Sequence, residues 1–253
     1  MNKEEQILIN RFLDLQKQAF YKNMPVTTDF LNLYEQTIFA SFIAKNPSPY
    51  ILDGGYDMAE RKVVCFLPMW ANEYDYHRQS FLKCVKIEFS APKYADSCTH
   101  RDYLGSIMNL GMDRGKFGDL IVNEQTAYLI GLVSAIDYVK DQLTMVKHSS
   151  VIVSETEFHQ LESAFQFDEI TGTVSSLRLD SVISLAFRIS RAKAADAIHA
   201  EKVFVNGKEV TQTDYKMKQG DVLSFRGVGK AMFKEYLSHT KKDREAIKIW
   251  RYR

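Results

Sequence analysis

The sequence has few of the residues that cross-link a small protein or bind a metal ion. Among 253 residues there are three cysteines, Cys65, Cys84 and Cys98, and none of them forms a C-x-x-C pair. A disulfide framework or a structural zinc site needs paired or clustered cysteines, so neither is expected. The six histidines show no metal-ligand spacing either. We therefore predict three reduced thiols packed as small apolar groups, with no metal and no cofactor.

Long apolar runs are also absent. No stretch of about twenty apolar residues is present to cross a bilayer. The N-terminal MNKEEQILIN carries acidic residues and does not resemble a signal peptide. We therefore expect a cytoplasmic chain with no membrane insertion. With 45% apolar and 26% charged residues, the chain is long enough to bury a sizeable core and to form roughly two domains.

The net charge of +1 conceals an asymmetry between the two parts of the chain. Residues 173–253 hold 17 Lys and Arg against 9 Asp and Glu, a net charge of +8, whereas residues 1–172 have a net charge of −7. Charge separated in this way suggests that one segment meets a polyanion, because a basic surface attracts phosphates whatever their sequence. Charge alone does not distinguish this from a solvated basic face.

The first 75 residues predict a small α/β unit. Apolar residues recur at helical spacing along the start of the chain and place these side chains near one face of a helix: Ile7, Phe12, Leu15 and Phe20. A second helix is expected to begin near Thr28-Asp29, which can cap it, and helical structure to extend to about Lys45. The glycines of ILDGGYD (51–57) predict a turn, and RKVVCFLP (61–68) predicts a strand.

Residues 76–165 predict a ferredoxin-like domain. The pattern indicates, in order, a strand at 81–89, a helix at 100–111, strands at 119–122 and 127–132, a helix near 134–140, and a strand within 143–153. This strand and helix order is that of a split βαβ unit. Such a unit is compatible with RNA binding without implying it, and the aromatic signature of RNA-recognition domains is absent.

A hinge is expected over residues 162–176, ahead of a basic domain that we assign to residues 174–253. The first helix of this domain should bury Leu179, Val182, Ile183 and Ala186, and Ser190 should cap the second. The pair Asn206-Gly207 predicts a hairpin turn. The tail after residue 230 contains helix formers and ends in aromatic and basic residues, which either stack on nucleic-acid bases or pack as a strand on the core.

Cations stand at the start of the second helix, where helix stability favours acids. Arg191 and Lys193 lie in its first turn. They oppose the helix dipole, at a cost of roughly a few tenths of a kcal/mol each. Beside unbonded backbone N–H groups they would instead form a phosphate site, which Arg178 and Arg188 could join. The alternative is a solvated basic turn.

The order of these features resembles the S-four RNA-binding domain, named after a small-subunit ribosomal protein. The matching positions are Arg178-Leu179-Asp180, Ser190-Arg191, Ala194, Ile198, Val203, Val205-Asn206-Gly207, Val210, Gly220-Asp221 and Arg226. The resemblance implies that a helical pair binds the backbone and shape of structured RNA. The candidate RNA-binding residues in this domain are Arg178, Arg188, Ser190, Arg191, Lys193, Lys202 and Asn206. One departure is Glu201, where many members have glycine.

The likeness extends through HRDYLGSIMNLGMDRGKFGDLIV (100–122), so that nearly the whole chain resembles the bacterial YlmH family. That resemblance implies an N-terminal α/β part, an RNA-binding middle domain and a C-terminal S-four domain. Three basic residues of the middle domain are further candidate contacts because of their charge. Arg101 is either a surface residue or an RNA contact, and Arg114 and Lys116 lie in a basic loop that is otherwise a plain turn.

Enzyme motifs are incomplete. His100-Arg101-Asp102 lacks the asparagine of the kinase catalytic loop, Gly115-Lys116 lacks the remainder of a phosphate loop, and no Gly-rich dinucleotide loop follows a strand. Asp180 is therefore expected to start a helix rather than to catalyse, although pseudouridine synthases have a similar Arg-Leu-Asp.

The leading hypothesis is a non-catalytic binder of structured RNA, either rRNA or tRNA or both, on the large ribosomal subunit, with a role in stalled-ribosome rescue implied by the family. Two alternatives remain open. One is an RNA-modifying enzyme that docks through the S-four domain. The other is an interaction adaptor linked to cell division, whose acidic first 170 residues bind a protein partner.

Overall fold

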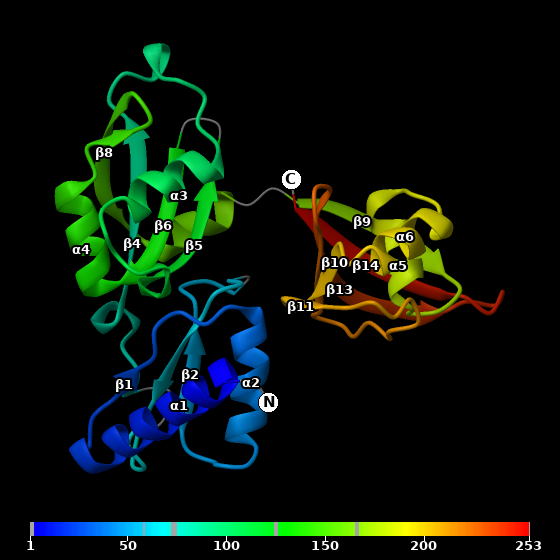
Figure 1. Ribbon diagram of the computed structural model, residues 1–253, viewed down its shortest axis with the longest axis horizontal. Coiled ribbons are helices and arrows are strands. Elements are labelled where there is room, and N and C mark those ends of the chain that lie inside the picture. Colours follow the sequence, from blue (N-terminus) through cyan, green and yellow to red (C-terminus); the bar gives the residue numbers. More distant parts are fainter. Residues whose placement is uncertain (1–2, 58, 72–74, 124–125, 165–166, 253) are drawn as a thin grey trace. The chain divides into compact units, whose positions relative to one another are not determined.

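The computed structural model describes residues 3–57, 59–71, 75–123, 126–164 and 167–252. The chain divides into two compact units, Met1–Phe165 and Gln166–Arg253, and each contains both helices and sheets (Figure 1). The α+β class predicted from the sequence is confirmed. Among the described residues, no helix is long and apolar enough to cross a membrane.

The first unit begins with a small sheet packed against two helices. Helix α1 spans Lys3–Lys22, α2 spans Leu33–Ile43, and strands β1 (Val26–Thr27), β2 (Tyr50–Asp53) and β3 (Val63–Phe66) pair antiparallel in the order β1-β3-β2. Aromatic rings fill the space between helices and sheet, with Phe12 and Phe39 meeting edge to face at 5.3 Å between ring centroids. Burial of these apolar side chains stabilises the layer.

Three predictions for this region need correction. The buried face of α1 is formed by Phe12, Leu15 and Ala19, whereas Ile7 and Phe20 are each 60% exposed. Helix α2 begins after Asn32, whose side chain accepts a hydrogen bond from the Glu35 backbone N–H in a capping box. Thr28 does not cap a helix, because its buried hydroxyl accepts a hydrogen bond from the Val64 N–H of the neighbouring strand.

The middle part of this unit has the predicted ferredoxin-like topology. Its elements are β4 (Leu82–Phe89), α3 (His100–Met108), β5 (Phe117–Val122), β6 (Thr126–Leu132), α4 (Val133–Gln142), β7 (Met145–Val146) and β8 (Ser149–Thr156), with short 3-10 turns at Arg78–Ser80, Pro92–Tyr94, Arg114–Lys116 and Phe158–Ala164. The sheet order is β5-β6-β4-β8-β7. The single strand predicted over 143–153 is a hairpin, since Lys147 turns the chain with φ of 53°.

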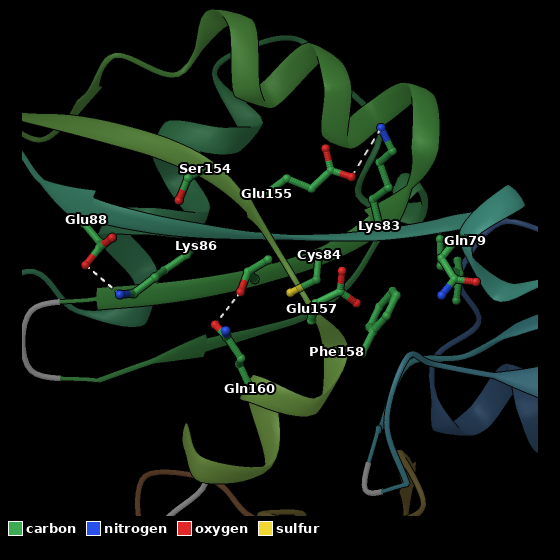
Figure 2. Close-up of a pocket in the computed structure, with 12 residues that line it drawn as sticks. Gln79, Lys83, Cys84, Lys86, Glu88, Ser154, Glu155, Glu157, Phe158 and Gln160 are labelled. Carbon is green, nitrogen blue, oxygen red and sulfur yellow. Dashed lines mark hydrogen bonds and ion pairs between the residues drawn. The ribbon is translucent and has the colours of Figure 1, made fainter.

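Helices α3 and α4 cover one face of this sheet. On the opposite face, side chains of β4 and β8 line a pocket (Figure 2).

Partly buried hydrogen bonds connect the two parts of the first unit. The Asp119 carboxylate on β5 accepts hydrogen bonds from the Tyr56 hydroxyl and from the backbone N–H groups of Glu60 and Arg61, at 2.7, 2.7 and 3.1 Å. The Arg61 guanidinium in turn donates to the carbonyl oxygens of Phe117 and Phe30. A domain boundary near residue 75 stays a prediction, and any such boundary is bridged by these bonds.

The second unit is a six-stranded antiparallel sheet with two helices on one face. Its elements are β9 (Phe167–Val174), α5 (Leu179–Phe187), α6 (Arg191–His199), β10 (Val203–Val205), β11 (Lys208–Glu209), β12 (Val222–Phe225), β13 (Gly229–His239) and β14 (Glu245–Tyr252). The strand order is β11-β10-β12-β13-β14-β9. The helix face predicted to be apolar, with Leu179, Val182, Ile183 and Ala186, is buried against this sheet, as predicted.

Two predictions at the edges of this unit are revised. Residues 167–174, expected within a hinge, form β9, which pairs with β14 over eight residues from Val174 to Phe167. The tail folds as strands β13 and β14, not as a helix, and buries Ile247 and Ile249. Packing of the tail on the core is therefore confirmed, and residues 165–166 of the expected hinge lie outside the described part.

Candidate RNA-binding site

The helical pair α5–α6 is positioned by a tight turn. Helix α5 ends at Phe187, and the following Arg188 caps it in a left-handed backbone conformation with φ of 54°. The Ser184 hydroxyl donates to the Ile189 carbonyl oxygen at 2.6 Å, and the Ile189 N–H donates back to the Ser184 carbonyl oxygen. The Ser190 hydroxyl then accepts from the Lys193 N–H and caps α6, as predicted. Ser190 is thus occupied within the protein as a helix cap.

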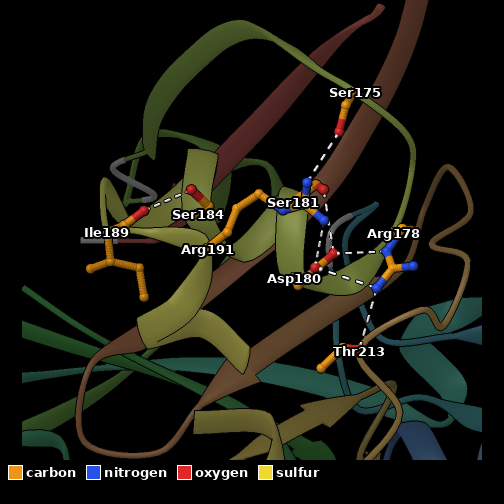
Figure 3. A network of polar contacts seen from close by, with 8 residues as sticks. All are labelled: Ser175, Arg178, Asp180, Ser181, Ser184, Ile189, Arg191 and Thr213. Atoms are coloured by element: carbon orange, nitrogen blue, oxygen red, sulfur yellow. Dashed lines mark hydrogen bonds and ion pairs between the residues drawn. The ribbon is translucent and has the colours of Figure 1, made fainter. Parts of the chain in front are cut away.

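A single buried carboxylate joins the two helices (Figure 3). Asp180, in the first turn of α5, has a side chain only 7% exposed, and its Oδ2 accepts from Arg191 Nη2 at 2.7 Å. Its Oδ1 accepts from Arg178 Nε at 3.2 Å. Each arginine has a second partner, since Arg178 also donates to the Thr213 hydroxyl and Arg191 to the Ser175 hydroxyl. The two guanidinium groups are therefore held side by side with limited rotamer freedom.

The charge of Asp180 is maintained by these arginines. Burial would raise the pKa of this carboxyl, but hydrogen bonds from Arg191 and Arg178, together with their charges, outweigh burial and place the pKa below its usual value. Asp180 is therefore ionised at neutral pH. The side chains of Arg191 and Arg178 remain 51% and 37% exposed, so each can still reach an external phosphate.

The first backbone N–H groups of α5 already donate hydrogen bonds within the protein, whereas those of α6 do not. At the start of α5, the N–H groups of Leu179 and Asp180 donate to the carbonyl oxygens of Tyr215 and Thr213. At the start of α6, the N–H groups of Arg191 and Ala192 have no acceptor within the described residues, and both residues are exposed. An anion could therefore bind at the N-terminus of α6 but not at that of α5.

Two exposed cations flank this helix start. Arg188 and Lys193 are both exposed, and no acidic group in the described part of the chain pairs with either. With Arg178, Arg191 and the single charge of Asp180, this cluster has a formal charge of +3. We name these four cations, with Asp180, the α6 cluster.

Lys202 lies at the other end of α6. A nine-residue helix is about 13 Å long, so Lys202 and Lys193 are separated by roughly that distance. The preceding Glu201 has φ of 57°, a conformation that glycine adopts without strain. This explains why the resemblance favours glycine at this position, and it means that Glu201 holds a strained backbone conformation. It also leaves an acid beside Lys202.

Asn206 faces inward. Its amide nitrogen donates to Asp221 Oδ1 at 2.8 Å, and its side-chain oxygen accepts from the Val222 N–H at 2.9 Å. Asn206 itself has φ of 49° and Gly207 has φ of 75°, as the predicted hairpin turn requires. The geometry therefore gives the Asn206 side chain a structural role, and its function as an RNA contact is not supported.

The three candidates in the first unit differ among themselves. Arg114 donates to the carbonyl oxygens of Phe117 and Gly118, and burial lowers its pKa to about 10, so it remains charged but is engaged inside the protein. Lys116 forms an ion pair with Asp29 at 2.7 Å. Arg101 is exposed in the first turn of α3. Only Arg101 retains the geometry of a surface contact.

Sequence reasoning missed the organising role of Asp180 and its neighbours Ser175 and Thr213. The signal available was the Arg-Leu-Asp order at the helix start, but the spacing between Asp180 and Arg191 does not by itself show that they meet. Among the described residues no group of three or more His, Cys, Asp or Glu side chains could hold a metal ion. The site as described is one of cations and backbone amides.

Comparison with known proteins identifies both domains. Residues 77–160 match the family model described as "Putative RNA-binding domain in YlmH", and residues 177–223 match the S4 domain. A solved structure titled cell division protein ylmH from Streptococcus pneumoniae has the same fold over 63% of this chain and 95% of that chain, with a TM-score of 0.54 at 16% identity.

A curated relative covers almost the whole chain. Ribosome-associated protein quality control protein P2 of Bacillus subtilis (strain 168) is 32% identical over 248 residues, which are 96% of this chain and 93% of that protein. The resemblance noted in the sequence is thereby confirmed along its length. The chain belongs to the YlmH family and carries that family's RNA-binding middle domain followed by an S-four domain.

Proposed function

We propose that the chain is a non-catalytic protein that binds structured RNA of the large ribosomal subunit through the α6 cluster. The observation that carries this proposal is the pair of arginines fixed by one buried carboxylate, beside Lys193 and the unbonded amides of α6. The paired N–H donors of an arginine guanidinium match the oxygen atoms of a phosphate. Because both side chains are already held in place before RNA binds, less side-chain conformational entropy is lost on binding. Such a surface recognises backbone and shape more than sequence.

The ribosomal partner is inferred from the family. The Bacillus relative is named as a ribosome-associated protein of quality control, and family resemblance implies large-subunit RNA with a tRNA in stalled-ribosome rescue. A ribosomal partner would place the protein in the cytoplasm. Exposed Arg101 in the middle domain supplies a second contact that would act together with the α6 cluster.

Enzymatic action is not favoured by the titratable groups. Burial raises the pKa of the Cys84 thiol to about 12, and burial with the charge of Asp53 does the same for Cys65, so both are protonated at neutral pH and are poor nucleophiles. Hydrogen bonds from Thr99 in a helix cap and from Lys147 lower the pKa of the Asp102 carboxyl to about 2. Structural roles explain these shifts.

A second candidate function rests on exposed apolar groups in the first unit. Tyr21 and Trp70 are 79% and 62% exposed, and Trp70 Nε1 donates to the Oδ1 of Asn23, two residues after Tyr21, at 2.6 Å. Exposed aromatics of this kind suit a protein partner, which would fit an adaptor linked to division. The adaptor function would be supported if a cell-division protein co-purified with the chain after RNase treatment and no longer did so with the Trp70→Ala variant.

Arg178 and Arg191 are poor choices for testing the RNA proposal, because reversing their charge would leave Asp180 buried beside two new acids. We choose Arg188→Glu with Lys193→Glu, since both side chains are exposed and neither forms an ion pair or a side-chain hydrogen bond within the described residues. The matched control is Lys22→Glu with Lys45→Glu, two exposed lysines of the first unit.

The measurement is binding of the full chain to large-subunit RNA across a salt series. If each cation meets a phosphate, the α6 pair should lower the slope of log K against log salt by about 2. The control pair should leave that slope unchanged. Equal slopes for wild type and the α6 variant would show that the α6 cluster does not contact the RNA.

A further inference from the structure

A further cation, Lys216, lies beside Arg178 of the α6 cluster. Lys216 is part of the segment between β11 and β12, and an isolated antiparallel bridge places it directly opposite Arg178, the residue before α5. The two residues are far apart in the sequence, so no local pattern indicates that they meet. The bridge therefore adds a cation that the charge pattern alone did not place at this site.

The hydrogen bonds around this bridge bring the side chains of Arg178 and Lys216 close together. Two backbone hydrogen bonds of 2.8 Å join their neighbours: Leu179 N–H to Tyr215 O, and Met217 N–H to Leu177 O. Arg178 and Lys216 are therefore a non-hydrogen-bonded pair of an antiparallel bridge. In such a pair the Cα atoms are about 4.5 Å apart and the two side chains lie on the same side.

The side on which Arg178 and Lys216 lie faces solvent. Side chains alternate along extended backbone, and the neighbouring Leu179 and Met217 are buried in the core of the C-terminal unit. Lys216 is exposed, and the side chain of Arg178 is partly exposed. Two cations are thus held opposite each other at the surface, with the apolar core behind them.

The nearby acids do not neutralise this pair of cations. The single charge of Asp180 is shared between Arg178 and Arg191, which approach it from different sides (Figure 3). Asp214 is exposed two residues before Lys216, and neither forms an ion pair in the part of the chain that the structure describes. With Lys216 the formal charge of the site rises from +3 to +4. Like charges directly opposite each other are destabilising, unless an anion binds between them.

Hydrogen-bond donors remain available at this pair. Arg178 donates through Nε and Nη2 to Asp180 and Thr213, whereas its Nη1 has no acceptor among the described residues. Figure 3 shows this remaining nitrogen pointing away from the carboxylate. The ammonium group of Lys216 supplies up to three more donors. One phosphate can accept from both side chains at once.

We propose that Arg178 and Lys216 together bind one phosphate of the RNA, while the free amides of α6 bind another. The inference rests on the proposed function, because it adds a second phosphate contact to the same RNA. Asp180 lies between the two sites and holds one arginine of each, so the fold sets the separation of the two phosphates. A folded RNA backbone that already has this separation loses less entropy on binding than a flexible strand does.

The test measures binding of the full chain to large-subunit rRNA across a salt series. Lys216→Gln removes one phosphate contact, so it should lower the slope of log K against log salt by about 1. It should also weaken binding about fivefold at low salt. Lys216→Arg keeps the charge and should bind like wild type. The matched control, Lys241→Gln, removes one exposed charge from the turn between β13 and β14 and should leave the slope unchanged.

A second measurement separates RNA contact from a structural role of Lys216. Because Lys216 repels Arg178 in the free protein, Lys216→Gln should raise the urea midpoint of the C-terminal unit at about 10 mM salt, and the gain should disappear at about 1 M salt. The fluorescence of Trp250 in a Trp70→Phe background follows this unit. An unchanged or lower midpoint at low salt would show that Lys216 is not held against Arg178, and would overturn the shared phosphate site.

Failure of the shared site can be told apart from failure of the proposed function. If Arg188→Glu with Lys193→Glu lowers the slope and Lys216→Gln does not, the α6 cluster binds RNA and the shared site is wrong. If neither variant changes the slope, both proposals are wrong. Equal losses of slope in Lys216→Gln and Lys241→Gln would show an effect of overall charge, which also rejects the shared site.

Discussion

Arg191 Nη2 and Asp180 Oδ2 lie 2.7 Å apart, and this contact fixes the start of α6 to the start of α5. The carboxylate is buried while the guanidinium is half exposed, so the bond both stabilises the helical pair and presents a charge to the outside. One residue therefore links the stability of the S-four domain to its RNA-binding surface.

Asp180→Asn should lower the unfolding free energy of the C-terminal unit by about 1.5–3 kcal/mol at pH 7, because charge-assisted hydrogen bonds to both arginines are lost. The chain has two tryptophans, so in a Trp70→Phe background the fluorescence of Trp250 reports this unit alone. Urea unfolding followed in this way gives the difference directly. A difference below about 0.5 kcal/mol would mean that the contact contributes little.

The stability difference between wild type and Asp180→Asn should depend on pH. The pKa of Asp180 is lower in the folded than in the unfolded chain, so its contribution is fully present above the unfolded value and is lost as pH falls through the folded value. The stability difference between wild type and Asp180→Asn should therefore be constant from neutral pH to the ordinary carboxyl range and shrink below it. A difference that grows with falling pH would contradict the assignment.

Glu201→Gly should raise both stability and RNA affinity. Glycine removes the strain of φ at 57°, for a net gain of up to about 1 kcal/mol after its greater unfolded-state entropy is counted, and it removes an acid beside Lys202. Glu201→Ala is the matched control, since it removes the charge but keeps a Cβ atom. The alanine variant should gain affinity without gaining stability, and equal stabilities of the two variants would count against strain.

Asp119→Ala should destabilise the first unit by more than about 2 kcal/mol, because two backbone N–H groups and one hydroxyl lose their shared acceptor. Tyr56→Phe removes one of these three bonds and should cost about 1 kcal/mol. Hydrogen exchange of the β5 amides, followed by mass spectrometry, measures both. Equal exchange in the two variants would show that the bonds to Glu60 and Arg61 carry no stability.

The fragment 167–252 should fold alone, whereas the fragment 175–252 should not. The longer fragment keeps β9, which forms one edge of the sheet and pairs with β14 along its length. Without it, β14 becomes an unpaired edge carrying Ile249 and Trp250. Circular dichroism of both fragments provides the measurement, and cooperative unfolding of the shorter one would show that β9 is dispensable.

Local signals in the sequence were sufficient for much of the fold. Alternation over 81–89, the Asn206-Gly207 turn and the Ser190 cap each depend on nearby residues, and the structure confirms all three. Strand β9 was missed because its acidic and small residues resemble a linker, and only the distant strand β14 makes it a strand. Pairing between residues about eighty positions apart leaves no local signal.

The site was predicted in composition but not in arrangement. The sequence placed Arg178, Arg191 and Lys193 at helix starts, yet it did not show that one buried aspartate serves both arginines, because that depends on how α5 packs against α6. Arg114 was a candidate contact on charge alone, and its guanidinium is engaged by backbone carbonyl oxygens. Charge in a sequence does not report which cations remain available at the surface.

The most direct test of the central claim is co-sedimentation of the full chain with large ribosomal subunits at low and at physiological salt. Wild type and the control Lys22→Glu with Lys45→Glu should pellet with the subunits, and Arg188→Glu with Lys193→Glu should remain in the supernatant at physiological salt. Pelleting of the α6 variant equal to that of wild type at both salt concentrations would contradict the claim that this cluster holds the protein on ribosomal RNA.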